Sequence, residues 1–318
     1  MSIQKSEEIA CFGALGSYSH EALYCHFGKS EDIVFYDHFE DLVNRVEAGE
    51  CRYGVLPVEN SSTGGIAEVY DLILRHNCHI VGEEYVHVQH LLLGTPGARL
   101  EDIRHVYSHP QGLAQCHAFL RLHDTWQLHS YFSTAQSAKE VAVREDKSVA
   151  AIAGRQAAEL YNLDILAADI CTNKTNYTRF VIISKDVLPH QGDKMTLVII
   201  TEHVPRALYK ALGYFYHSGM NMTHLESRPI PGKPFEYSFH IDVTGDLDST
   251  ACKQALEKLE GQCKYFNILG TYRAAENRHW PSICSYESQR RHVGRPYMSG
   301  TRVVGKRESV RNEIWDIP

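Results

Sequence analysis

The sequence lacks the features that mark several classes of protein. It contains no run of about twenty apolar residues, so neither a transmembrane helix nor a membrane partner is expected. The opening residues, Met1 to Glu8, lack the apolar core of a secretory signal. Basic residues are not in excess, since 32 Lys and Arg stand against 39 Asp and Glu. The formal net charge of -7 argues against a nucleic-acid partner held through its phosphates.

Cysteine and histidine are present, but not in the patterns that build disulfide frameworks or metal sites. The 9 cysteines are irregularly spaced and include no Cys-x-x-Cys pair, which indicates reduced thiols in a cytoplasmic protein. Among the 19 histidines, His87 and His90 are close in sequence, but they are not part of a His-Glu-x-x-His motif. No metal site is therefore predicted.

The order of expected elements divides the chain into two folded regions and a tail. Residues 9–186 alternate short apolar strands with amphipathic helices, which predicts an α/β domain with a mostly parallel sheet. Residues 187–193 read as a linker. Residues 194–273 follow the order βαββαβ of a ferredoxin-like domain, with a helix opening at Pro205. Residues 274–318 fit neither pattern and are expected to form an extension.

Four loops place polar residues next to strands, and they carry the functional argument. They are Gly13 to Glu21, Gly54 to Gly65, Ser108 to Gln115 and Asn173 to Phe180. Ser19 is the expected N-cap of the first helix, and helix N-termini offer free N–H groups to anions. The two-residue period of a strand puts Thr178 and Phe180 on one face and Arg179 on the other. A hydroxyl donor beside an aromatic ring suits a small anionic ring compound.

In order and spacing, these loops resemble the signature loops of the prephenate dehydratase family. The matching patterns are Gly-x-x-Gly-(Thr/Ser)-(Phe/Tyr)-Ser, Gly-Val-x-Pro-(Ile/Val)-Glu-Asn-Ser, Ser-His-Pro-Gln and Thr-Arg-Phe. Further on, Glu226-Ser227-Arg228-Pro229 is similar to a motif of that family's ACT regulatory domain. The resemblance covers about residues 9–272. It implies a catalytic domain of two lobes, as in periplasmic binding proteins, with crossings near 87–90 and 168–176 and the site in the cleft between the lobes.

The resemblance also implies a reaction and a substrate. Prephenate would lose its ring hydroxyl and carbon dioxide to give phenylpyruvate, and aromatisation would drive the step without a cofactor. By the family pattern Thr178 donates toward the ring hydroxyl. Glu59 is the rival proton source if burial raises its pKa, and the residues leave the two open.

The remaining candidates would hold the substrate. Arg179 either binds a carboxylate or forms a structural ion pair, and Asn176 either orders its loop or touches the substrate. Phe180 is expected under the ring. The full set of expected substrate-binding residues is Ser17, Tyr18, Asn60, Ser61, Ser108, Gln111, Asn176, Arg179 and Phe180.

The C-terminal resemblance implies control by L-phenylalanine bound between paired ACT domains, in a homodimer or homotetramer. One departure concerns Arg206, which stands where the family usually has Gly. Two alternatives stay open from the sequence, an arogenate dehydratase and a non-catalytic sensor of aromatic ligands. The expected effector-binding residues are Ala207, Leu208, Asn221, Glu226, Ser227 and Arg228.

Overall fold

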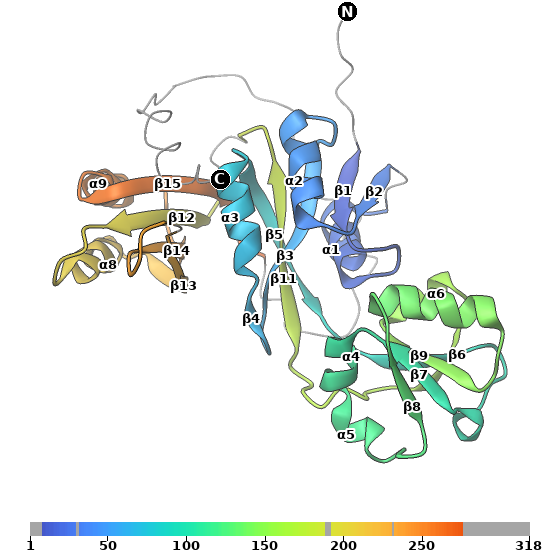
Figure 1. Ribbon diagram of the computed structural model, residues 1–318. Helices are drawn as coiled ribbons and strands as arrows, with labels where there is room; N and C mark the ends of the chain where they lie inside the picture. The colour runs from blue at the N-terminus through green and yellow to red at the C-terminus, as the bar shows by residue number, and fades with distance from the viewer. Residues whose placement is uncertain (1–7, 30–31, 188–191, 231, 276–318) are drawn as a thin grey trace, which may run out of the picture. The chain divides into compact units, whose positions relative to one another are not determined.

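The computed structural model of the protein describes residues 8–29, 32–187, 192–230 and 232–275. The chain divides into two compact units, Met1–Val187 and Leu188–Pro318 (Figure 1). The C-terminal extension expected over 274–318 lies outside the described residues from position 276 onward.

The first sheet forms one lobe of the first unit, here called the first lobe. Its strand order is β2-β1-β3-β11-β5, with β4 paired to β3. Three helices pack on this sheet, and α2 and α3 also contact each other (Figure 1). The strands are β1 (Ile9–Phe12), β2 (Ile33–Tyr36), β3 (Tyr53–Asn60), β4 (Gly64–Gly65), β5 (His79–His87) and β11 (Tyr177–Ser184). The helices are α1 (Tyr18–Phe27), α2 (Phe39–Ala48) and α3 (Ala67–Arg75).

The second sheet forms the second lobe, which comprises residues 91–167. Its order is β10-β6-β9-β7-β8, and α6 packs on β9 through Ala135, Ala138 and Val141. Every residue of β9 is buried, as its run of Val, Ala and Ile requires. The strands are β6 (Leu91–Gly94), β7 (His105–Ser108), β8 (Gln127–Ser130), β9 (Val149–Ala153) and β10 (Asp164–Ala167). The helices are η1 (Leu100–Asp102), α4 (Pro110–Gln115), α5 (His117–Leu120), α6 (Thr134–Arg144) and α7 (Arg155–Leu160).

The chain crosses between the lobes twice, and these crossings correct one expectation. Residues 88–90 lead from β5 to β6, and residues 168–176 lead from β10 back to β11, as the sequence predicted. The expected mostly parallel sheet is wrong, because both sheets are mixed. β11 runs antiparallel to both β3 and β5, and β6 runs antiparallel to β9. A strand entered by a crossing rather than by a βα unit need not share its neighbours' direction.

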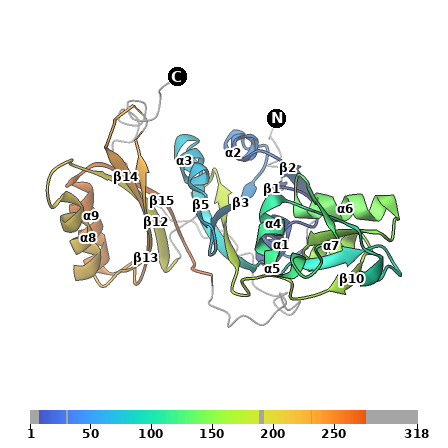
Figure 2. The same cartoon turned by 60° about the horizontal axis from the view of Figure 1, so that its bottom comes forward.

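The second unit is a four-stranded sheet with both helices against it (Figure 2). The order β13-β14-β12-β15 is that of a ferredoxin-like fold. Its core includes Leu197, Phe215, Ile241 and Leu259. The helix expected from Pro205 begins two residues later, because Arg206 is its N-cap. The elements are β12 (Lys194–Thr201), α8 (Ala207–His217), β13 (Asn221–Pro229), β14 (Tyr237–Thr244), α9 (Thr250–Glu260) and β15 (Cys263–Tyr272).

Two smaller expectations also need correction. The N-cap of α1 is Ser17 rather than Ser19, since the Ser17 hydroxyl accepts from the His20 N–H at 3.3 Å. Cys25 is disulfide-bonded, so the expectation of reduced thiols is wrong there. The cysteines with free thiols are Cys11, Cys51, Cys78, Cys116, Cys171, Cys252 and Cys263. Within the described ranges, no helix has the length and apolarity to cross a bilayer.

Candidate active site

The centre of the candidate site is a pair of residues on neighbouring strands. Thr178 of β11 lies directly opposite Asn60 of β3. A bulge in this pairing leaves Val58 without a partner on β11, since Arg179 is opposite Glu59 and Phe180 is opposite Pro57. Val55 and Asn60 are an odd number of positions apart on β3, so a regular strand would put the two side chains on opposite sides of the sheet. The bulge lets both face the same side. Asn60 and Thr178 therefore share a face of the sheet.

The side-chain amide of Asn60 joins the loops around it. Its Nδ2 atom donates to Thr178 Oγ1 at 2.9 Å and to Asn176 Oδ1 at 2.8 Å. Its Oδ1 atom accepts from the backbone N–H groups of Ser62 at 3.0 Å and Thr63 at 3.1 Å. Asn60 and Asn176 are both buried. One amide thus fixes the loop after β3 and the Thr178 hydroxyl together.

A second layer of hydrogen bonds holds the crossing 168–176 against the loop after β3. Ser61 Oγ accepts from the Tyr177 N–H at 2.9 Å and donates to the Thr175 carbonyl at 3.1 Å. Ser62 Oγ donates to Asn176 Oδ1 at 3.2 Å and accepts from Asn173 Nδ2 at 2.9 Å. The hydroxyls and amides in these two loops are thereby ordered at the strand ends.

Arg179 lies on the other face of β11 and is part of a buried ion pair. Its Nε atom is 3.0 Å from Glu83 Oε2, and its side chain is 3% exposed against 1% for Glu83. A second guanidinium nitrogen lies 3.7 Å from Glu59 Oε2. Of the two roles left open for Arg179, the structural ion pair is the one present. Glu59 is placed beside this cation, and not beside Thr178.

Phe180 is a core residue of the first lobe. Its side chain is buried among Cys11, Leu23, Val55 and Ile182. The sequence expected this ring on the Thr178 face of the strand, and the two-residue period of β11 puts it there. Phe180 packs in the core cluster of the first lobe.

The loop before α1 is held against the second lobe. The Tyr18 hydroxyl donates to the Gln89 carbonyl at 2.9 Å and lies 3.0 Å from His90 Nδ1. His90 Nε2 is in turn 2.8 Å from Gln115 Oε1. Ser17 uses its hydroxyl as the helix cap. Tyr18 therefore links α1 to the first crossing of the chain.

The loop from Ser108 to Gln115 contributes one exposed side chain and one buried hydroxyl. Gln111 Nε2 donates to Thr63 Oγ1 at 3.3 Å, which links the second lobe to the loop around Asn60. Ser108 is fully buried, and its hydroxyl donates to the Ile152 carbonyl at 2.8 Å. A Cβ added at Gly112 would lie 2.6 Å from the Ser108 hydroxyl, so only glycine fits there. Ser108 thus shapes the start of α4.

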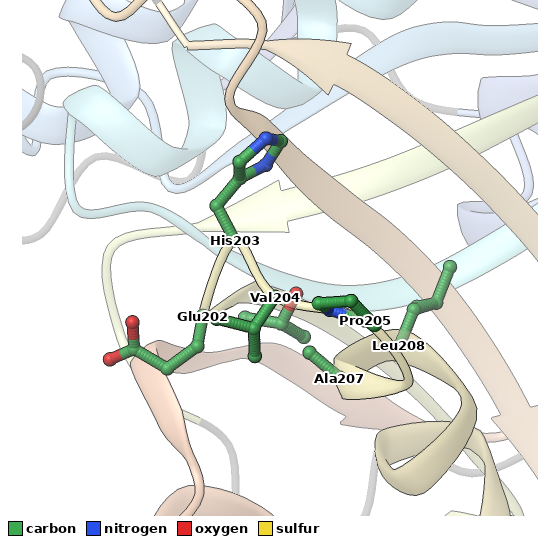
Figure 3. A pocket seen from close by; sticks show the side chains of 7 residues that line it. Glu202, His203, Val204, Pro205, Ala207 and Leu208 are labelled. Atoms are coloured by element: carbon green, nitrogen blue, oxygen red, sulfur yellow. The ribbon is translucent and has the colours of Figure 1, made fainter.

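The candidate regulatory region of the second unit is an open hollow of about 380 Å³ before α8. Figure 3 shows Ala207 and Leu208 beside Val204 and Pro205 along this hollow. Arg206 precedes α8 with a φ of 73°, in the left-handed region that favours glycine. The candidates of β13 are outside the lining of this hollow, with Asn221 and Ser227 exposed and Glu226 3.7 Å from His224 Nε2. The expected effector residues on β13 therefore do not line this hollow.

Comparison with known proteins decides the family. The family named Prephenate dehydratase matches residues 9–187, and thus more than half of the chain. A bifunctional chorismate mutase/prephenate dehydratase from Enterobacter agglomerans is 35% identical over 270 residues, or 83% of this chain and 70% of that protein. The chain belongs to the prephenate dehydratase family.

Two solved structures share the fold of this chain. A prephenate dehydratase from Arthrobacter aurescens in complex with L-Phe has 28% identity and a TM-score of 0.73, covering 86% of this chain and 92% of that one. GqqA, described as a novel type of quorum quenching acylase, has 32% identity and a TM-score of 0.75, covering 84% and 98%. The two lobes and the C-terminal sheet are thus shared with a solved prephenate dehydratase.

Not all of the residues that the family resemblance indicated lie together. Asn60, Ser61, Asn176 and Thr178 form one hydrogen-bonded cluster, and Gln111 reaches it through Thr63. The other candidates lie apart from this cluster. Ser17 caps a helix, Tyr18 links α1 to the first crossing, and Ser108 is a buried donor. Arg179 belongs to an ion pair, and Phe180 is a core residue. The sequence analysis missed Ser62, Thr63, Asn173, Glu83 and His90. Ser62, Thr63 and Asn173 stand within the quoted loops, whereas Glu83 and His90 had no motif to mark them.

Proposed function

We propose that this member of the prephenate dehydratase family performs the decarboxylating dehydration of prephenate at the cluster around Asn60 and Thr178. The products are phenylpyruvate, carbon dioxide and water, with one proton consumed. The step belongs to phenylalanine biosynthesis. The observation that carries the assignment of roles is the hydrogen bond from Asn60 Nδ2 to Thr178 Oγ1.

That hydrogen bond decides which way the Thr178 hydroxyl donates. The Asn60 amide nitrogen has only hydrogens to offer, so Thr178 Oγ1 accepts in this contact. The Thr178 proton is left for another acceptor, and the ring hydroxyl of prephenate supplies one. As the ring C–O bond breaks, the donated hydrogen bond stabilises the charge that develops on the departing oxygen. The electrons of the breaking C–C bond to the ring carboxylate complete the aromatic ring.

Glu59 is the weaker candidate for the proton source. Its carboxylate lies 3.7 Å from the Arg179 guanidinium, on the face of the strand opposite Asn60 and Thr178. A neighbouring cation favours the charged form of a carboxylate, and a charged carboxylate has no proton to give. Glu59 is instead assigned a positioning role through Arg179.

The test is steady-state turnover of prephenate by three variants of the full chain. Thr178→Ala should lower kcat by about a hundred- to a thousandfold, the usual effect of losing one preorganised donor. Thr178→Ser keeps the hydroxyl and should keep most of the rate, while Glu59→Gln should lose less than Thr178→Ala. A Thr178→Ala protein with normal circular dichroism and near wild-type turnover would overturn the role given to Thr178.

The same assay separates this function from its alternatives. Arogenate differs from prephenate by an amino group in place of a keto oxygen, so kcat/KM for both compounds decides between the two dehydratases. A non-catalytic sensor would bind either compound without producing phenylpyruvate or phenylalanine. We assign prephenate as the preferred substrate because the matching family and the bifunctional relative from Enterobacter agglomerans are both named for prephenate dehydratase.

We further assign L-phenylalanine as the effector of the second unit, which would bind between units of two chains in a homodimer or homotetramer. The support is the relative solved with L-Phe and the separation of the hollow at Ala207 from the candidates on β13. In this proposal a second copy completes the site. We also propose that the protein acts in the cytoplasm, which is supported by the irregular spacing of its cysteines.

A further inference from the structure

Two cysteines meet where the second crossing of the chain passes the end of α4. Cys116 is fully buried at the junction of α4 and α5, and Cys171 is partly buried in the crossing 168–176. The backbones beside them are tied together, since the Thr172 N–H donates to the Gln115 carbonyl at 2.8 Å. Thr172 Oγ1 also accepts from the Ala118 N–H at 3.3 Å. The two thiols are therefore held side by side by their own chain segments.

The sulfur of Cys171 is surrounded by hydrogen-bond partners. The His90 N–H donates to it at 3.1 Å, and the Cys116 thiol is close enough to it for the pKa of each thiol to depend on the other. The Cys171 thiol in turn lies 3.7 Å from the Val88 carbonyl. Cys171 thus contacts both crossings between the lobes, because Val88 and His90 belong to the first one.

The electrostatics of the pair divide the roles of the two thiols. The hydrogen bond from Cys116 and the His90 N–H lower the pKa of Cys171 to about 7, although burial opposes them. The same hydrogen bond and burial raise the pKa of Cys116. A thiolate is the form that attacks oxidants and disulfides, so Cys171 is the attacking residue. Cys116 is the resolving residue, whose thiol then attacks the oxidised sulfur of Cys171.

We propose that Cys116 and Cys171 are a redox-modification site that peroxide converts into an intramolecular disulfide. In the first step the Cys171 thiolate attacks a peroxide oxygen, the O–O bond breaks, and a sulfenic acid and hydroxide form. In the second step Cys116 attacks the sulfenic sulfur and water leaves. Two thiols are oxidised and one hydrogen peroxide is reduced to two waters.

The disulfide would act on the enzyme through the crossing that carries it. Residues 172–176 lead directly to Thr178, and Asn173 and Asn176 belong to the cluster around Asn60. The other end of the bond is attached to α4, whose Gln111 reaches the same cluster from the second lobe. Oxidation therefore adds a covalent bond between two segments that are otherwise held together by hydrogen bonds alone, and turnover falls.

The experiment treats the full-length protein with hydrogen peroxide, alkylates the remaining thiols and maps cross-linked peptides by mass spectrometry. A Cys116–Cys171 peptide that disappears with dithiothreitol is expected, together with a several-fold fall in turnover that the reductant reverses. Cys171→Ala should keep the rate of the reduced enzyme and lose the sensitivity to peroxide. The matched control is Cys263→Ala, since Cys263 is similarly half-buried but burial raises its pKa to about 11.

Two results would overturn the proposal. One is recovery of Cys116 and Cys171 as separate alkylated peptides after oxidation. The other is an equal loss of turnover in Cys171→Ala and in the wild type. Cys116→Ser serves as a second probe, and it should accumulate the sulfenic acid at Cys171, detectable with a dimedone label, if the order of attack is right.

Discussion

At the scale of single residues, the properties of Thr178 depend on Asn60. A lone threonine hydroxyl rotates and donates to whichever acceptor is nearest. With Asn60 Nδ2 at 2.9 Å, the oxygen of Thr178 is held as an acceptor and its proton is directed elsewhere. The amide is in turn held by two backbone N–H groups on its oxygen. The active hydroxyl is thus oriented by a side chain that is itself fixed by the backbone.

Replacing Asn60 by aspartate tests this orientation. The carboxylate keeps the acceptor for the N–H groups of Ser62 and Thr63 but presents an oxygen to Thr178. The Thr178 proton then turns toward that oxygen and away from the substrate, so kcat should fall roughly a hundredfold. Circular dichroism should stay unchanged, because the loop after β3 keeps its hydrogen bonds. An Asn60→Asp enzyme with wild-type kcat would show that the amide does not orient Thr178.

At the scale of elements, three strands share one buried ion pair. Arg179 of β11 lies between Glu59 of β3 and Glu83 of β5, all on one face. Diagonal neighbours on adjacent strands are within reach of long side chains. The pair fixes the register of the strand that carries Thr178.

Arg179→Met should destabilise the first unit by roughly 3 kcal/mol, because it leaves the buried Glu83 carboxylate without its cation. The matched control is Arg45→Met, since Arg45 pairs with Glu50 and both side chains are about half exposed. That exposed pair is screened by solvent and should contribute much less. Urea unfolding of both variants gives the comparison. Equal destabilisation would mean that burial of the Arg179 pair has no energetic consequence.

Helices α1 and α7 supply a pH-dependent element. Burial, aided by Glu159 of α7, raises the pKa of Glu21 from 4.5 to about 7. The folded protein thus holds this proton more tightly than the unfolded chain, so the stability contribution is complete below pH 4.5 and is lost as pH rises to 7. Glu21→Gln removes that loss. The denaturation midpoint of this variant is compared with that of wild type at each pH. The difference should increase in favour of the variant from pH 5 to pH 8, by the equivalent of roughly 2 kcal/mol in the free energy of unfolding.

Glu159→Gln is the companion variant for this measurement. Without the second carboxylate, Glu21 should have a pKa closer to its ordinary value, and the pH drift should be smaller than in wild type. Parallel pH profiles for wild type and both variants would contradict the assignment to Glu21.

The sequence predicted the elements well but not the side-chain partners. Period-two alternation and loop motifs located β11, the two crossings and the cluster residues Asn60 and Thr178. The bulge at Val58 was not predictable, because it depends on how two strands distant in sequence align. The partner of Arg179 was missed for the same reason, since nothing beside Glu83 marks it. Ser17 is the cap in place of Ser19 because the helix starts two residues earlier than its polar pattern indicates.

At the scale of the whole molecule, the proposed catalytic cluster and the proposed effector residues lie in separate compact units. An effector bound to the second unit changes turnover only if it favours one arrangement of the protein over another. L-phenylalanine at millimolar concentration should therefore give a heat of binding and lower the rate on prephenate. Calorimetry beside activity measures both. Absence of both effects would reduce the second unit to an assembly module.

Arg206→Gly should change the affinity for L-phenylalanine. The φ of 73° costs a side chain on the order of 1 kcal/mol that glycine does not lose. The substitution also removes a bulky cation next to the hollow at Ala207 and Leu208. A change in either direction is informative, while an unchanged dissociation constant would place the effector away from the start of α8.

The two crossings also determine the order in which the strands of the first sheet are synthesised. Strand β11 lies between β3 and β5, yet the ribosome makes it only after the entire second lobe. Until then β3 and β5 each present an open edge to other chains. The segment that closes this gap is the one that carries Thr178. A nascent chain therefore acquires the Thr178 hydroxyl and its protection from aggregation in the same event, and a chain cut short before Tyr177 has neither.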